Sequence, residues 1–584
     1  MTAKSFSPSG IILDKPGHYR FLENVELNIN TEGAAAVIVR SHDVTIDLCD
    51  RTLQLTQAAY DAFENVSAIV VESGYNNFTL QNGHIRRFSD QGVIVVTDNY
   101  LPTDHHGIII KNVTVGNIGK IETQTPLDIF TRAGININGS TDVVIEDCDA
   151  FDVKAFDDSE GISCNYCDHI KIDNCTGHDN QSNELGGYCI GIGLYAFTTA
   201  SITRSRALRN SGRQVYAFSP FIGTSIVMDR CLSHYNRGFG PAAEDLSGGF
   251  CGAFTVDTVN SATLTYCEAD YNLTEANSID NANRNFCTGI QFANGTAGTI
   301  DHCKASFNST ASSEQLTGGG CVGVDINRVD GVTVTNCFAQ GNTMFNLAET
   351  GTFFGFAVGF DSDFSSNVVF ENCTAIANNP QPGSSTDPKA CAGFYASIFP
   401  EGGPFSNIIF RNCKSTNHQV ETDGILVAGF LIGEDVGSTI LTYPEAVVID
   451  NCIAENNRNT SEGSEEFGLG IGLMEGSNAC VVSGNTLSRN GVGIYVNTLR
   501  DDATLLAGNM VVKNKLIGNL VAGIVNLSET TSYAKNYAHR NGSPVNNYVD
   551  LPDGTPIRTW NLGSPPNSVN NNGILDPLDN IDIQ

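Results

Sequence analysis

The chain has 584 residues and a formal net charge of −32, because 64 Asp and Glu side chains outnumber 32 Lys and Arg. This balance, without any Lys/Arg-rich run, argues against nucleic acid as a partner and disfavours anionic polysaccharides, which leaves neutral glycans and proteins as expected ligands. No stretch approaches the roughly 18 apolar residues of a membrane span, and 59 Gly with many Asn indicate turns rather than helices.

The N-terminal segment contains no apolar stretch of the kind found in a Sec-type signal peptide. Residues 1–34 also contain no complete copy of the repeat that follows. We expect them to form an N-terminal cap, because a solenoid needs a polar end that prevents edge-to-edge growth.

From residue 35 to residue 542 the sequence repeats with a mean period of about 32 residues, which is typical of a solenoid. Each repeat has three short runs of alternating β-branched residues separated by Asn, Gly and Asp, so it predicts three strands. One position, here called the marker, recurs sixteen times, as Cys in ten repeats, Asn in five and Ser in one. The marker falls at residues 49, 82, 112, 148, 175, 205, 231, 267, 303, 337, 373, 413, 452, 485, 509 and 536.

An Asn directly before the marker indicates a bend between the second and third strands, because Asn tolerates a left-handed backbone. These residues are Asn174, Asn336, Asn372, Asn412 and Asn451. With this fingerprint, residues 35–542 resemble the pectin-lyase-like superfamily. The resemblance implies an all-β, single-stranded right-handed parallel β-helix of about 14–16 coils, and it leaves function open because the fold hosts lyases, hydrolases, epimerases, adhesins and phage tailspikes.

The first strand of most coils begins at a Gly, for which we expect a required turn conformation; a flat track for a packed loop or partner is the alternative. With Gln214 and Ala253 as the starts of the two exceptional coils, alternation places pairs such as Val324 and Ile326 inside. The glycines are Gly92, Gly134, Gly161, Gly191, Gly289, Gly323, Gly355, Gly393, Gly429, Gly470, Gly493 and Gly523.

In enzymes of the superfamily that this chain resembles, reactive residues point outward from the first strand. Here those positions are mostly neutral and polar, with aromatics among them. Such a face suits stacking on sugar rings and hydrogen bonds to hydroxyls, and a merely solvated surface is the alternative. The predicted glycan-binding residues are Tyr195, Tyr216, Gln291, Asn327 and Tyr395.

Asp257 and Asp325 are the only carboxylates that this alignment places on the face. Two coils would separate them by ~10 Å along the axis, close to the roughly 6.5–9.5 Å used by inverting glycosidases. They are therefore the candidate catalytic pair. Family signatures are incomplete: Asp157-Asp158-Ser159-Glu160 is the nearest match to a polygalacturonase, without an Arg-Ile-Lys segment, and Arg328 is the only candidate base for a lyase.

The eighteen cysteines predict a buried stack of reduced thiols, with within-coil disulfides such as Cys251 to Cys267 as the alternative. Cys164-x2-Cys167, followed by Cys175 and Cys189, resembles the start of a zinc site, but Cys175 is a marker and Cys164 takes an inward strand position, which favours a structural role. We expect no resident metal and no cofactor, with calcium as the one ion left open.

Residues 543–584 leave the repeat, contain the only Trp, Trp560, and are expected to be an assembly segment or a disordered tail. The sequence favours a non-catalytic β-helix, extracellular or on a particle surface, that binds a neutral glycan or assembles with copies of itself. The alternative is a carbohydrate-active enzyme, a glycoside hydrolase or a polysaccharide lyase, so enzymatic activity is left open.

Overall fold

The computed structural model describes most of the chain at the level of individual residues. The described residues are 1–98, 101, 103–121, 131–183, 187–240, 249–276, 285–312, 319–346, 355–381, 389–397, 406–421, 425–433, 445–460, 468–474, 477–497, 508–526, 531–542, 548–550 and 581–583. They form two compact units, residues 1–243 with 248–275 and residues 244–247 with 276–584.

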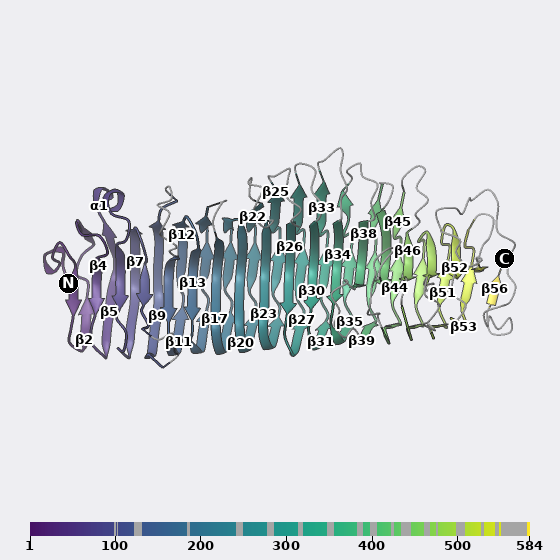
Figure 1. Cartoon of the computed structure of the whole chain (residues 1–584), viewed down its shortest axis with the longest axis horizontal. Coiled ribbons are helices and arrows are strands. Elements are labelled where there is room, and N and C mark those ends of the chain that lie inside the picture. The colour runs from purple at the N-terminus through teal and green to yellow at the C-terminus, as the bar shows by residue number, and fades with distance from the viewer. Residues whose placement is uncertain are drawn as a thin grey trace. The chain divides into compact units, whose positions relative to one another are not determined.

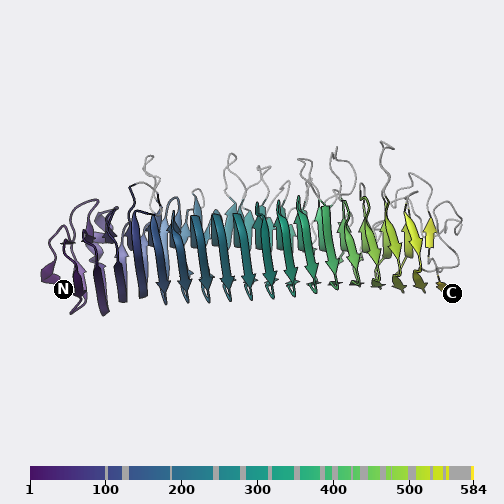
Figure 2. The same cartoon turned by 90° about the horizontal axis from the view of Figure 1, so that it is seen from below.

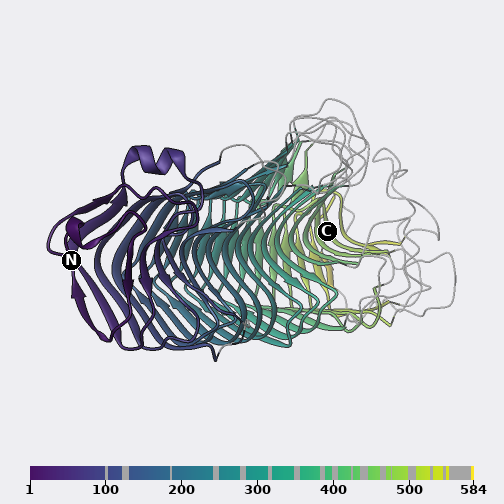
Figure 3. The same cartoon turned by 60° about the vertical axis from the view of Figure 1, so that its left-hand side comes forward.

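Each unit is a parallel β-helix in which every coil supplies up to three strands, and each strand pairs in parallel with its equivalent one coil later. The predicted all-β fold, a right-handed parallel β-helix, is confirmed. Within each unit the strands lie side by side in Figure 1, Figure 2 shows the same strands from below, and the oblique view of Figure 3 follows the chain through successive coils.

Among its described residues, the first unit contains one short α-helix, α1 (Gln57–Ala62), and one 3-10 turn, η1 (Ala3–Ser5). Its first strands, three of which continue into the second strand, are β1 (Ile11–Leu13), β4 (Ala35–Val39), β6 (Ser67–Val71), β8 (Val93–Val95), β10 (Arg132–Asn138), β13 (Ser159–Asn165), β17 (Tyr188–Thr203), β20 (Gln214–Asp229) and β23 (Phe250–Thr265). Its second strands, three of which continue into the third, are β2 (Gly17–Arg20), β5 (Val44–Leu55), β7 (Phe78–Phe88), β9 (His105–Gly119), β11 (Ser140–Glu146) and β14 (Asp168–Asp173). The third strands and the short strands after them are β3 (Val25–Leu27), β12 (Asp149–Ala155), β15 (Thr176–His178), β16 (Gln181–Ser182), β18 (Arg206–Leu208), β19 (Ser211–Gly212), β21 (Leu232–His234), β22 (Arg237–Gly240), β24 (Glu268–Asp270) and β25 (Leu273–Ala276).

The second unit repeats the same order. Its first strands are β26 (Asn285–Ala293), β30 (Gly319–Asn327), β34 (Gly355–Asp363), β38 (Lys389–Ser397), β42 (Ile425–Ile432), β46 (Leu469–Leu473), β49 (Val492–Val496), β52 (Ala522–Asn526) and β55 (Tyr548–Asp550). Its second strands are β27 (Ala297–Asp301), β31 (Asp330–Thr335), β35 (Ser366–Glu371), β39 (Ser406–Arg411), β43 (Val448–Asp450), β47 (Val481–Ser483), β50 (Met510–Val512) and β53 (Ser532–Ala534). The third strands and the short strands after them are β28 (Lys304–Ser306), β29 (Ser309–Ser312), β32 (Phe338–Gln340), β33 (Thr343–Asn346), β36 (Thr374–Ile376), β37 (Pro380–Gln381), β40 (Lys414–Thr416), β41 (Gln419–Val420), β44 (Ile453–Glu455), β45 (Arg458–Asn459), β48 (Thr486–Ser488), β51 (Lys515–Ile517), β54 (Tyr537–His539) and β56 (Ile581–Ile583).

The bend before the third strand has the left-handed backbone predicted for it. The five Asn residues of the fingerprint have φ between 51 and 56°. The marker alignment is wrong at four other positions. Cys49, Asn82 and Asn112 have φ of 53, 58 and 52° and so form the bend instead of following it. Asn514, not Asn509, is hydrogen-bonded to Asn485 in the same column. Asn is suited both to a left-handed bend and to a column of hydrogen-bonded buried amides, so the residue type alone could not distinguish the two kinds of position at these Asn residues.

All eighteen cysteines lie in the described residues, and all are thiols, seventeen of them buried. Marker cysteines lie at the corner between the second and third strands, where the thiol donates hydrogen bonds to backbone carbonyl groups. Cys175 Sγ, for example, donates to the carbonyl oxygens of Asp173 at 3.3 Å and Ile145 at 3.4 Å. The cysteines of the first strand lie at another corner, where Cys321 Sγ donates to the carbonyl oxygen of Asn308 at 3.0 Å. The stack of reduced thiols is therefore the arrangement found, and the two columns do not face each other.

A ladder of buried Asn side chains follows the third strand. Asn308 Nδ2 donates to Asn342 Oδ1 at 3.0 Å, and Asn342 Nδ2 donates to Asn378 Oδ1 at 2.9 Å. The glycine column packs against this ladder, since a Cβ on Gly323 would lie 2.6 Å from the carbonyl oxygen of Gly359 and 2.8 Å from Asn342 Nδ2. None of the described glycines of the column has a positive φ. The expected turn conformation is therefore wrong, and lack of space explains the glycines.

The two ends of the chain also contain strands. In the segment expected as a cap, β1 pairs with β4, and β2 and β3 both pair with β5. In the segment expected as a tail, β55 pairs with β52 and β56 with β54. Trp560 and the residues around it lie outside the described residues, as do most residues of the predicted assembly segment. No helix in the described part of the chain is long and apolar enough to cross a membrane.

Candidate functional site

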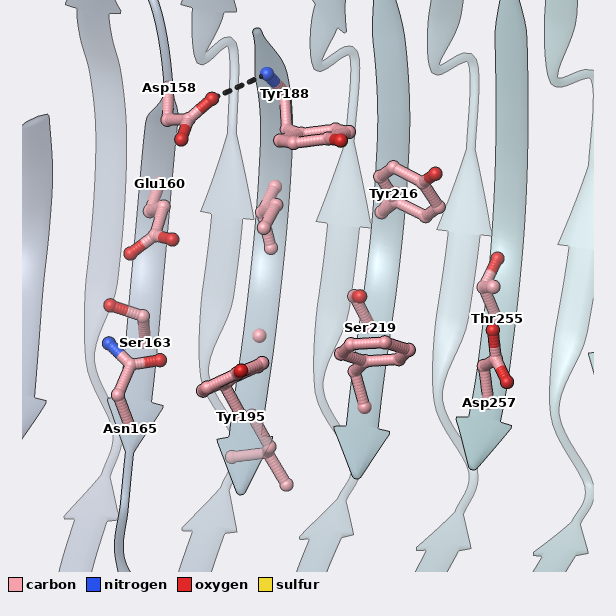
Figure 4. A pocket seen from close by; sticks show the side chains of 14 residues that line it. Asp158, Glu160, Ser163, Asn165, Tyr188, Tyr195, Tyr216, Ser219, Thr255 and Asp257 are labelled. Carbon is pink, nitrogen blue, oxygen red and sulfur yellow. Dashed lines mark hydrogen bonds between the residues drawn. The ribbon is translucent and has the colours of Figure 1, made fainter. Parts of the chain in front are cut away.

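A groove of about 410 Å³ lies on the outer face of the first strands in the first unit, lined by residues of β13, β17, β20 and β23. Its floor is a column of small side chains that stand next to one another on successive coils, Ser163, Gly193, Ser219 and Thr255 (Figure 4). This volume lies within the roughly 300–1,000 Å³ of small-molecule sites. Small residues thus leave room between larger side chains on both sides.

Aromatic side chains form one row on each side of the floor. In one row the ring centroids of Tyr188 and Tyr216 are 5.7 Å apart. In the other, Tyr195 and Phe221 are 5.8 Å apart with an interplanar angle of 29°. Tyr188, Tyr195 and Phe221 remain 45, 37 and 36% exposed, so part of each side chain is accessible to a ligand. The second row arises from the register of β17 and β20, which places Tyr195 opposite Phe221.

Carboxyl groups lie at the β13 end of the groove. Asp158 accepts a hydrogen bond from the backbone N–H of Tyr188 at 2.8 Å (Figure 4). Burial raises the pKa of Glu160 to about 7, and the neighbouring charge of Asp158 acts in the same direction. Burial also raises the pKa of Asp158. Near neutral pH, Glu160 can therefore donate a hydrogen bond or a proton as well as accept one.

Three of the predicted residues, Tyr195, Tyr216 and Asp257, lie in this groove. The alignment of the β20 coil is nevertheless wrong, because Ala217, not Gln214, occupies the glycine column next to Gly191. A start at Gln214 would place Phe218, four residues later, on the outer face, whereas Phe218 is fully buried. Asp158, Glu160 and Tyr188 were not predicted as ligand-binding residues, although the acidic run 157–160 before the strand was a signal for the first two.

The other predicted residues lie in the second unit, on the outer face of β26, β30 and β38. Gln291 Nε2 donates to Asp325 Oδ2 at 2.8 Å, and burial raises the pKa of Asp325 to about 6. Asn327 is in register with Asp363, and Tyr395 with Asp361. Asp257 and Asp325, the candidate catalytic pair, belong to different units.

Asp257 and Asp325 are not the only carboxylates on outward first-strand positions. Asp361 and Asp363 of β34 also occupy this face, only 2 and 7% exposed. They were missed because the coil was started at Gly355, whereas Gly359 packs in the glycine column against Gly323. Burial and the charge of Asp325 raise the pKa of Asp363 well above its usual range.

The zinc-like spacing of Cys164 and Cys167 does not gather a ligand set in the described residues. Both side chains are buried, and Cys167 Sγ donates to the carbonyl oxygen of Asn165 at 3.3 Å. Cys175 bonds carbonyl groups at a different corner. Cys167 and Cys175 therefore lie at different corners of the coil.

No family model and no curated protein matches the chain. Among solved structures it is similar to a single-residue mutant of the periplasmic alginate epimerase AlgG, at 11% identity over 74% of this chain and 79% of that chain, with a TM-score of 0.25. A double mutant of the same epimerase gives 10% identity, 83 and 79% coverage and a TM-score of 0.24. Values this low assign no activity to the chain.

Proposed function

We propose that this protein is a carbohydrate-binding β-helix that holds a neutral oligosaccharide in the groove of its first unit. The observation behind the proposal is the pair of exposed aromatic rows on either side of a floor of small side chains. Sugar rings present apolar faces that stack on Tyr and Phe, while their hydroxyls need nearby hydrogen-bond partners.

The charge of the groove supports a neutral ligand. Asp158, Glu160 and Asp257 line it, and none of the described lining residues is basic. An anionic polysaccharide would meet repulsion there, whereas the hydroxyls of a neutral one can donate to these carboxylates and to Asn165.

The proposal is tested by screening the full-length protein on a glycan array and measuring the affinity of each neutral hit by calorimetry. Tyr195→Ala should weaken binding by about 1 kcal/mol or more, roughly fivefold, because it removes stacking area. Tyr235→Ala is the matched control, since Tyr235 is 58% exposed in the same unit but does not line the groove. Equal losses for both variants would contradict the proposal.

The second candidate function is a glycoside hydrolase, and the pKa of Glu160 near 7 favours it, because a general acid must be protonated at the working pH. Asp257 lines the same groove and is the carboxylate available as its partner there. Incubation of each array hit, followed by product analysis, separates the two functions. New reducing ends that disappear in Glu160→Gln would establish the hydrolase, while intact glycan after prolonged incubation supports binding alone.

Self-association and a location outside the cell or on a particle surface are separate parts of the proposal. Light scattering on the purified full-length chain tests the first: a mass that is a multiple of 62.3 kDa supports it, and the monomer mass contradicts it. Detection of the protein on intact cells or particles tests the second.

A further inference from the structure

Three side chains that bind metals in other proteins converge on the third strands of the first unit. His234 ends β21 and is in register with Asp270, which ends β24. Glu268 lies two residues before Asp270, so both carboxylates stand on the same side of β24. The ligand atoms of the three residues lie within 4.8 Å of one another, which no other group of three His, Cys, Asp or Glu achieves in the described part of the chain.

The two carboxylates of this cluster lie close together on β24. Asp270 is only 5% exposed, and Glu268 is half-buried beside it. A positive charge placed between two neighbouring carboxylates stabilises both of them. A divalent cation would supply that charge and accept a lone pair from the imidazole of His234 at the same time.

The donor set favours one class of cation. Imidazole nitrogen suits Zn²⁺, Mn²⁺, Fe²⁺, Co²⁺ and Ni²⁺, whereas Ca²⁺ and Mg²⁺ prefer sites made of oxygen alone. Three protein ligands also leave coordination positions for water, as in open zinc sites. We propose that His234, Glu268 and Asp270 form a binding site for a divalent transition-metal ion that joins two successive coils at their third strands.

The strand scaffold supports this assignment. Leu232 pairs with Glu268, Ser233 with Ala269 and His234 with Asp270, so the register holds the three ligands at fixed relative positions. Ala269, between the two carboxylates, is fully buried and anchors β24 in the core. A site on paired strands needs little rearrangement when the ion binds.

The test is calorimetric titration of the full-length protein with ZnCl₂ after removal of metals by EDTA and dialysis. The wild type should bind one Zn²⁺ with a dissociation constant in the micromolar range or tighter, and His234→Ala and Asp270→Asn should each weaken it at least tenfold. His18→Ala is the control, because His18 is an exposed histidine on β2 and should leave the dissociation constant unchanged. Zinc should also raise the unfolding temperature of the wild type and of the control but not of the two ligand variants.

Unchanged zinc affinity in both ligand variants would overturn the site, as would a wild type that binds neither Zn²⁺, Mn²⁺ nor Co²⁺ below about 1 mM. Stronger binding of Ca²⁺ than of Zn²⁺ would overturn the choice of ion. If Asp270→Asn fails to fold, Glu268→Gln at the more exposed position replaces it, with the same tenfold loss expected. The Co²⁺ complex gives an independent readout, because its visible absorption should be lost in His234→Ala.

Discussion

At the scale of single residues, the charge of the groove near neutral pH depends on the protonation of one carboxyl group, that of Glu160. Glu160 is half-buried next to Asp158, and its Oε2 is enclosed without a hydrogen-bond partner among the described residues. Burial disfavours the charged form and raises its pKa to about 7. A bound sugar would exclude more water from the carboxyl group, and this would raise the pKa further.

We therefore expect ligand binding to be accompanied by proton uptake. Affinity for a neutral glycan should increase several-fold as the pH falls from about 8 to about 6, through the pKa of Glu160. Calorimetry in two buffers of different ionisation enthalpy measures the proton uptake directly. Glu160→Gln mimics the protonated form and should bind with little pH dependence; an equally steep profile in this variant would assign the proton to another group.

His418 replaces Asn in the buried ladder of the second unit. Its Nδ1 accepts a hydrogen bond from the backbone N–H of Asn378 at 3.2 Å, and the backbone N–H of His418 donates to Asn457 Oδ1 at 3.3 Å. Nε2 is buried without a hydrogen-bond partner in the described residues. Burial lowers the pKa of His418 to about 4, so the folded protein keeps this imidazole neutral.

Because the pKa of His418 is lower in the folded than in the unfolded chain, the unfolded chain binds the proton more readily. The stability contributed by neutral His418 is present above about pH 6.5 and is lost as the pH falls through 4, on the order of 3 kcal/mol in total. His418→Asn restores an amide to the ladder and should reduce this loss. Urea unfolding of both proteins at about pH 7 and about pH 4.5 measures the difference, and identical acid sensitivity would contradict the assignment.

At the scale of strands, the coil depends on a close approach between the first strand and the Asn ladder. The strand pairing joins Val322 with Val358 and Val324 with Phe360, and it skips the glycines between them. Gly323 and Val324 therefore both point inward, and there is no room for a side chain at Gly323. The glycine column therefore fixes the position of the first strand against the Asn ladder, and this position determines which of its residues face outward.

Gly323→Ala should destabilise the protein by about 2–3 kcal/mol, because the new Cβ would meet backbone oxygen at 2.6 Å and the amide of Asn342 at 2.8 Å. Gly508→Ala is the matched control, since nothing lies within 4 Å of its Cβ position, and it should cost less than about 0.5 kcal/mol. Denaturant unfolding measures both. Similar values for the two variants would show that backbone freedom, and not space, explains the column.

The sequence predicted the strands and bends well because each is repeated in many coils. It failed where one coil departs from the repeat: Ala217 takes the place of Gly, and Gly355 lies four residues before the true position, Gly359. A local error of this kind shifts every outward residue of the strand. Tyr195 was nevertheless placed correctly on the outer face of the first strand. The burial that changes the pKa of Glu160 depends on neighbouring coils and cannot be read from the sequence.

At the scale of the whole molecule, the cysteines report on unfolding. Seventeen of the eighteen thiols are buried, and only Cys49 is partly exposed. Alkylation of the native protein should label Cys49 first and the others only as the coils open. Mass spectrometry of a time course in native buffer, and of a denatured sample without reductant, measures both. Most of the eighteen should react in denaturant alone, and resistance until reductant is added would contradict the thiol assignment.

The ladder bonds make each coil interchangeable with its neighbours. Asn342 receives from Asn308 the same amide hydrogen bond that it gives to Asn378, and the strands on either side repeat the same pairing. Removal of one complete coil between equivalent residues would therefore leave every donor with an acceptor, whereas removal of part of a coil would break all columns at once. Natural variation in the length of such a protein should accordingly proceed in steps of one whole coil, with groove residues gained or lost as sets.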